Sequence, residues 1–122
     1  MKNSRQVFGS FAEKEAEKYL KKKGYSILEK NFSTPLGEID LIVEKDGILI
    51  FVEVKAGKQD SDFSPAVHYN FQKQKKLLQL AKFYEAKTKF DQQMQFDLVV
   101  VTQKEAQLQI DHLEDVIQDT EL

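Results

Sequence analysis

Two apolar, β-branched stretches, 38–44 and 48–55, flank the dipeptide Asp46-Gly47 and constrain the fold more than any other feature. An Asp-Gly pair between such stretches is the strongest short-range signal for a two-residue β-hairpin, because both loop positions need positive φ. The stretches are long and apolar enough for central strands. The sequence therefore predicts an antiparallel hairpin in the middle of a sheet.

The hairpin loop also predicts which residues face each other, starting from Lys45 opposite Ile48. One face is then wholly apolar, with the pairs Val43–Ile50, Leu41–Val52 and Ile39–Val54. The other face carries the pairs Ile42–Phe51, Asp40–Glu53 and Glu38–Lys55. A slip of one residue would mix the two sets, so this register is favoured.

In this register the carboxylates of Asp40 and Glu53 face each other with Cβ atoms about 5 Å apart, an arrangement that destabilises a sheet. It becomes favourable when a divalent cation lies between them, and Mg²⁺ or Mn²⁺ commonly uses one or two carboxylates. Lys55 projects from the same face and could orient or polarise a water, or stabilise charge on a phosphate. The ordinary alternatives are a solvated face, or a surface cluster in which Lys55 pairs with Glu38 and Glu53.

The other patterns predict an αβββαββ order, and so an α/β fold with a mixed central sheet flanked by helices. A helix is expected over 8–23, ended by Gly24, and a second from Ser64-Pro65 to about Lys87. Further strands are expected over 25–32, 96–102 and 108–113. Glu13 lies at the flank of the apolar stripe of the first helix, where an acid is either a surface residue or a further metal ligand.

Composition limits the class of protein. With 122 residues, 1–122 reads as one domain, and we expect flexible ends at 1–7 and 115–122. The longest apolar run, 48–52, is too short for a membrane helix, and Lys2 and Arg5 precede no apolar stretch that would make a signal peptide. The absence of cysteine excludes disulfides and thiolate sites. We expect a cytoplasmic protein that uses carboxylates and lysines.

The net charge of −2 hides an alternation of charge along the chain. Residues 1–30 and 73–89 are basic, with net charges of +4 and +5, whereas 31–72 and 90–122 are acidic, at −4 and −7. Solvated helix faces explain such runs equally well. The sharper interpretation is a basic surface for phosphates around an acidic centre.

Several motifs together carry a family resemblance. They are Gly37-Glu38-Ile39-Asp40-Leu41-Ile42, Phe51-Val52-Glu53-Val54-Lys55, Glu13 with Ala16 and Leu20, Gly24-Tyr25, Asn31, Lys73 and Phe96-Asp97-Leu98-Val99. The chain resembles the YraN family of small bacterial proteins, which are described as endonuclease-like and related to Holliday-junction resolvases. That family lies within the restriction-endonuclease-like PD-(D/E)xK superfamily.

The resemblance implies a restriction-endonuclease-like sandwich that hydrolyses phosphodiester bonds. It implies Mg²⁺ or Mn²⁺ at Asp40 and Glu53, with the Val54 carbonyl as an extra ligand. It also implies Lys55 as the catalytic lysine and Glu13 as an auxiliary acid. The family pattern tends to place arginine at three positions that are Ser33, Gly57 and Gln95 here. The grip on nucleic acid is then expected from Lys73, Lys75, Lys76, Lys21, Lys22 and Asn31.

The sequence leaves three functions open. The first is a metal-dependent endonuclease acting on DNA, including branched or damaged DNA. The second is a nucleic-acid-binding module on a nuclease fold without activity, and the third is a protein-interaction domain that uses the acidic C-terminal segment. A homodimer would suit cleavage of two strands, but no residue requires one. His68, His112 and Asp97 are better explained as ordinary structural residues.

Overall fold

The structure, a computed structural model, describes residues 4–58 and 71–117, and these form two helices and five strands. The elements are α1 (Ser4–Lys22), β1 (Ser26–Thr34), β2 (Gly37–Lys45), β3 (Ile48–Lys58), α2 (Phe71–Thr88), β4 (Gln93–Lys104) and β5 (Gln107–Leu113). The predicted αβββαββ order is therefore present in the described part of the chain. The helix start expected at Ser64-Pro65 lies outside it. α1 begins at Ser4, four residues earlier than the sequence indicated.

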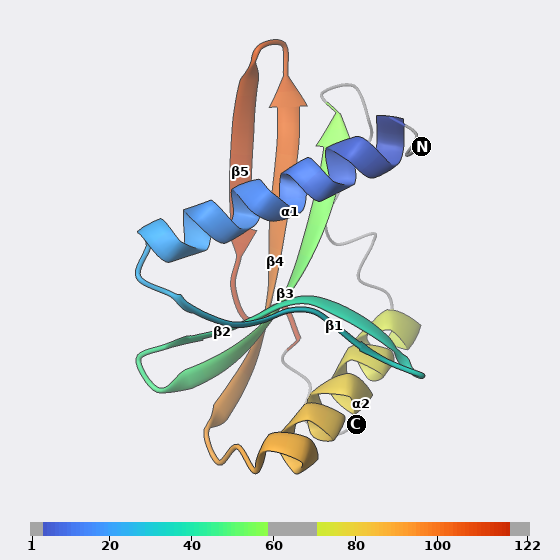
Figure 1. The fold of residues 1–122 in the computed structure, drawn as a ribbon, viewed down its shortest axis with the longest axis vertical. Helices are drawn as coiled ribbons and strands as arrows, with labels where there is room; N and C mark the ends of the chain where they lie inside the picture. Colours follow the sequence, from blue (N-terminus) through green and yellow to red (C-terminus); the bar gives the residue numbers. More distant parts are fainter. Residues whose placement is uncertain (1–3, 59–70, 118–122) are drawn as a thin grey trace.

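All five strands form one mixed sheet in the order β1-β2-β3-β4-β5. β3 and β4 are parallel, and the other three neighbouring pairs are antiparallel. α2 lies between β3 and β4 in the chain and provides the long connection that a parallel pair requires. Figure 1 shows α1 crossing one face of the β3–β5 part, while α2 lies beside the curved β1–β2 part.

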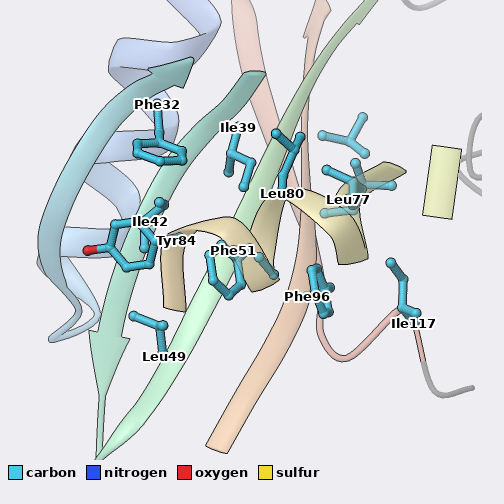
Figure 2. Packing of buried hydrophobic residues seen from close by; sticks show 13 residues of the cluster. Phe32, Ile39, Ile42, Leu49, Phe51, Leu77, Leu80, Tyr84, Phe96 and Ile117 are labelled. Carbon is cyan, nitrogen blue, oxygen red and sulfur yellow. The ribbon is translucent and has the colours of Figure 1, made fainter. Parts of the chain in front are cut away.

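Each helix covers its own hydrophobic cluster. The α2 cluster joins Leu77, Leu80, Ala81 and Tyr84 to Phe32, Ile39, Ile42, Leu49, Phe51, Phe96, Leu98, Val100 and Ile117 (Figure 2). The α1 cluster joins Ala12, Ala16 and Leu20 to Tyr25, Leu41, Val43, Ile50, Val52, Val99 and Val101. Because side chains alternate along a strand, the central strands are buried on both faces. The mixed α/β prediction is thus confirmed.

α1 can lie close to the sheet because its contact stripe is small. Ala12 and Ala16 stand one turn apart, and Leu20 continues the stripe; all three are fully buried. The helix ends at Lys22 and is terminated by Gly24, whose φ of 96° is easily adopted only by glycine. The Tyr25 N–H then donates to the Leu20 carbonyl at 3.0 Å, which closes the helix in a Schellman-like turn.

The sheet forks between β2 and β3. The predicted hairpin register is confirmed from Lys45–Ile48 to Leu41–Val52, and no backbone pair between these two strands follows in the described chain. β2 continues beside β1 as far as Gly37–Thr34, while β3 continues beside β4 as far as Lys58. Figure 1 shows β1 and β2 curving away from β3 at this level.

At the fork, β2 also changes the face that its side chains present. Leu41 belongs to the α1 cluster, yet Ile39, two residues away, is buried in the α2 cluster. The expectation that both share one face is therefore wrong. The cause lies at the level of Asn31, which sits across from Asp40 between the pairs Lys30–Leu41 and Phe32–Ile39 and has a φ of 52°. Asn31 belongs to β1, and a residue in the left-handed region turns its strand. β2 stays paired with β1 on both sides of this turn, so both strands present the opposite face beyond it.

Candidate metal centre at the strand fork

Asp40 stands in β2 where the fork opens. Its Oδ2 accepts a hydrogen bond from the Val54 N–H at 2.8 Å. The predicted direct pair of Asp40 and Glu53 across the ladder is wrong, because the ladder ends at Leu41–Val52. Asp40 instead reaches across the gap with its side chain and holds the backbone of β3.

β3 brings Glu53 and Lys55 to the same fork. Lys55 Nζ lies 3.1 Å from Glu53 Oε1, and the two side chains are 27% and 14% exposed. The second oxygen of Glu53, Oε2, is buried. The ion pair between Glu53 and Lys55 confirms their expected proximity, and their low exposure argues against a solvated surface cluster.

Glu13 and Glu38 complete an acidic group around Asp40. One carboxylate oxygen from each of these three residues lies within 4.8 Å of the others. Glu13 comes from α1, as the sequence suggested. Glu38 was expected opposite Lys55, but the ladder that would place it there has ended, and its Oε2 lies 3.4 Å from the Ser33 hydroxyl. The i, i+2 spacing predicts that Glu38 lies on the same face as Asp40, but Glu38 was not among the candidate ligands that the sequence suggested.

The acidic group acts most strongly on Asp40. Burial raises the pKa of Asp40 to about 7, and the neighbouring charges of Glu13, Glu53 and Glu38 add to the rise. The hydrogen bond from Val54 opposes it by favouring the carboxylate. Negative charge on Asp40 is therefore poorly compensated by the protein itself.

The chemistry of the donor set suits a hard divalent cation. The side chains of Asp40, Glu53, Glu13 and Glu38 offer only oxygen ligands, which Mg²⁺ and Mn²⁺ prefer. A cation there would compensate the charge that raises the pKa of Asp40. The residues present therefore fit the group that the sequence motifs implied.

The fork brings together some of the expected phosphate-binding residues and not others. Lys76, exposed on α2, lies against Gly37 at the start of β2, with its Cε 2.8 Å from where a Cβ of residue 37 would stand. Asn31 is exposed across from Asp40. Lys22 lies at the far end of α1, nine residues from Glu13, or about 13 Å along the helix axis.

Three further lysines were expected to bind phosphate, namely Lys21, Lys75 and Lys73. Lys21 pairs with Glu17 at 2.9 Å on α1, and Lys75 is exposed on α2. The side chain of Lys73 lies outside the described residues, as does His68. The structure thus assigns Lys76 and Asn31, rather than the end of α1, to the neighbourhood of the acidic group.

These features define a small α/β protein whose strand fork gathers four carboxylates and a lysine. A family model described as "Uncharacterised protein family UPF0102" matches residues 12–101, and the chain belongs to this family. UPF0102 is the YraN family that the motifs resemble.

Relatives from several bacteria are similar over nearly the whole chain. A UPF0102 protein of Thermodesulfovibrio yellowstonii is 40% identical over 106 residues, which cover 87% of this chain and 91% of the relative. One of Caldanaerobacter subterraneus is 43% identical over 101 residues, covering 82% and 83%. One of Clostridium perfringens is 39% identical over 102 residues, covering 83% and 84%. No helix in the described part is both long and apolar enough to cross a membrane.

Proposed function

We propose that this chain is a metal-dependent endonuclease with a restriction-endonuclease-like fold, hydrolysing phosphodiester bonds in DNA. The observation that carries the proposal is the position of Asp40 at the fork. There its side chain holds Val54, the Glu13 and Glu38 carboxylates lie close to it, and it feels the charge of Glu53, which pairs with Lys55. Three separate elements, α1, β2 and β3, contribute to this one group.

Asp40 and Glu53 would hold Mg²⁺ or Mn²⁺, with the Val54 carbonyl as a further ligand. The cation supplies Lewis-acid stabilisation of charge on the phosphate. Glu53 holds Lys55 beside the site by an ion pair. From there the Lys55 ammonium would stabilise negative charge that develops on the phosphoryl oxygens. The Val54 N–H fixes the direction of the Asp40 carboxylate, which keeps the site ordered before the substrate arrives.

The DNA backbone would be gripped chiefly from the α2 side. Lys76 reaches the start of β2 beside Glu38, which brings a cation from α2 close to the acidic group. Asn31 offers an exposed amide across from Asp40. We expect Lys75, Lys73, Lys21 and Lys22 to add sequence-independent attraction for phosphates, which weakens as salt rises.

The first experiment measures Mn²⁺ and Mg²⁺ binding by calorimetry, with and without a short DNA duplex. Wild type should bind, and Asp40→Asn should lose the site. Glu44→Gln is the matched control, because Glu44 is a partly buried acid of the same strand but pairs with Leu49 inside the regular hairpin. If wild type binds neither cation, whether or not the DNA duplex is present, the catalytic proposal is wrong.

A second experiment separates catalysis from binding. Branched, nicked and single-stranded DNA substrates are compared, and Glu53→Gln should abolish turnover while DNA binding persists. Binding without turnover in wild type would instead indicate a non-catalytic nucleic-acid module. Failure to bind DNA at low salt would leave a protein-interaction domain.

A further inference from the structure

A second polar cluster lies on the other side of β3 from Asp40, where β4 and β5 meet the C-terminal half of α1. Its centre is Asp97 on β4, the only charged side chain that is buried in the described part of the chain, with 0% exposure. His112 on β5 places Nε2 2.7 Å from Asp97 Oδ2, and its side chain is 8% exposed. The proposed nuclease reaction uses neither residue.

The hydrogen bonds around the pair orient both side chains. Asp97 Oδ1 accepts from the Gln95 side-chain amide at 2.9 Å and from the Asp115 N–H at 3.0 Å. Its Oδ2 is therefore directed at the imidazole. Since a carboxylate only accepts, His112 Nε2 donates, and in the neutral ring Nδ1 accepts from the Tyr19 hydroxyl at 3.1 Å.

A third potential ligand comes from the segment after β5. The Glu114 carboxylate has an oxygen within 4.8 Å of the ligand atoms of Asp97 and His112. The Tyr25 hydroxyl donates a hydrogen bond to the Glu114 carboxylate and so helps to hold it. The facing cations, Lys23 and Lys45, lie over the rings of Tyr19 and Tyr25 rather than on the carboxylates.

We propose that Asp97 Oδ2, His112 Nε2 and Glu114 form a Zn²⁺ site that is distinct from the oxygen-only site at the fork. Two carboxylates and a neutral imidazole carry the charge that a divalent cation balances. An imidazole ligand selects zinc-like metals, whereas the fork offers oxygen donors that suit Mg²⁺. Tyr19, Gln95 and the Asp115 N–H would act as the supporting contacts that orient zinc ligands.

Zinc would take the place of the proton that His112 Nε2 donates to Asp97 Oδ2. Bonds of about 2.0–2.1 Å at tetrahedral angles set two ligand atoms about 3.3 Å apart, so the 2.7 Å contact must open by about half an ångström. The imidazole proton then moves from Nε2 to Nδ1. The Tyr19 oxygen changes from donor to acceptor of that hydrogen bond, and water fills the fourth position.

The test is calorimetric titration of Zn²⁺ into the full chain, with excess Mg²⁺ present to occupy the fork. We expect one Zn²⁺ per chain, with binding lost in His112→Gln and strongly weakened in Glu114→Gln. Tyr19→Phe, which removes only a supporting contact, should weaken binding about 10–100-fold. Glu105→Gln, in the exposed turn between β4 and β5, is the matched control and should bind as wild type does.

A spectroscopic measurement separates a metal site from a purely structural hydrogen bond. On adding Zn²⁺, the ¹⁵N signals of His112 should change from the Nε2–H to the Nδ1–H tautomer. The proposal is overturned if wild type binds no Zn²⁺, or if Glu114→Gln, in which an exposed side chain is altered, binds Zn²⁺ unchanged. Loss of zinc in Asp40→Asn would also overturn it, because the ion would then belong to the fork.

Discussion

The Asp40 carboxylate accepts a hydrogen bond from the Val54 N–H at 2.8 Å, immediately after the backbone ladder between their strands has ended at Leu41–Val52. The side chain thus takes the place of a backbone carbonyl. This contact lets β2 diverge from β3 without leaving the N–H of Val54 unsatisfied, which would be costly in a partly buried position. The same contact places the carboxylate at the point where α1, β2 and β3 come together.

Asp40 makes the stability of the metal-free protein depend on pH. Its pKa rises from an ordinary value near 3.8 to about 7 in the fold, so the carboxylate is disfavoured in the native state. Stability from the protonated group is present below pH 4 and is lost as pH rises to 7. Asp40→Asn keeps an acceptor for the Val54 N–H. Over that pH range its free energy of unfolding should rise above that of wild type by about 1–3 kcal/mol, and the partial exposure of Asp40 limits the effect.

Urea unfolding at several pH values measures this difference. Glu44→Gln, outside the fork, should follow wild type throughout. Adding Mg²⁺ at pH 7 should remove the advantage of Asp40→Asn, because the cation stabilises only a carboxylate. An advantage that does not change between pH 4 and 7 would show that the charge of Asp40 is not the cause.

Lys55 should control turnover more than binding. If its ammonium stabilises charge that develops at the phosphate, Lys55→Met lowers kcat by about 10²–10³-fold. Lys55→Arg should retain part of the rate, and Lys104→Met, at the exposed end of β4, should leave it unchanged. Steady-state kinetics on the best DNA substrate provide the measurement. A rise in KM with an unchanged kcat would assign Lys55 to substrate binding alone.

Replacing Gly37 or Gly9 by alanine should change the stability of the protein in opposite directions. Gly37 has a φ of 145°, and a Cβ there would stand 2.8 Å from Lys76 Cε, so Gly37→Ala should destabilise the fold by about 1 kcal/mol or more. Gly9 lies in α1 with nothing within 4 Å of an added Cβ, so Gly9→Ala should stabilise it by about 0.5–1 kcal/mol. Thermal unfolding of both variants tests the two signs, and equal shifts would contradict the strained geometry at Gly37.

Asn31 should tolerate glycine but not valine. Its φ of 52° is accessible to Gly and Asn, whereas a β-branched side chain there is strained by about 1–3 kcal/mol. We expect Asn31→Val to destabilise the protein and to loosen Ile39, whose face is set by this turn, while Asn31→Gly stays near wild type. Chemical denaturation measures the free energy of unfolding of each variant, and amide hydrogen exchange in β2 measures how firmly the strand is held at the fork. A stable Asn31→Val variant would mean that the strand turns without this residue.

Local patterns identified much of the fold. The Asp46-Gly47 loop and the alternation around it predicted five correct residue pairs, from Lys45–Ile48 to Leu41–Val52. Gly24 correctly marked the end of α1, because a C-terminal cap depends on residues a few positions apart. The same local reasoning extended the ladder to Asp40 and Glu53, where it failed.

The failure has a physical cause that period-2 alternation does not contain. β2 has to satisfy β1 on one side and β3 on the other, and the turn at Asn31 rotates β2 away from β3. Ile39 consequently moved into the α2 cluster, and Glu38 joined Glu13 and Asp40. Each of these outcomes depends on contacts between elements far apart in the chain.

The sequence by itself determined the strand and helix order, the hairpin register and the residue types available for chemistry, because these depend on local geometry and on side-chain periodicity. Only the tertiary structure decided where the sheet forks, that Asp40 holds Val54 across the gap, and that Asp97 meets His112 beneath α1. Those contacts arise from packing two helices on opposite faces of one twisted sheet. No short stretch of the chain encodes that packing.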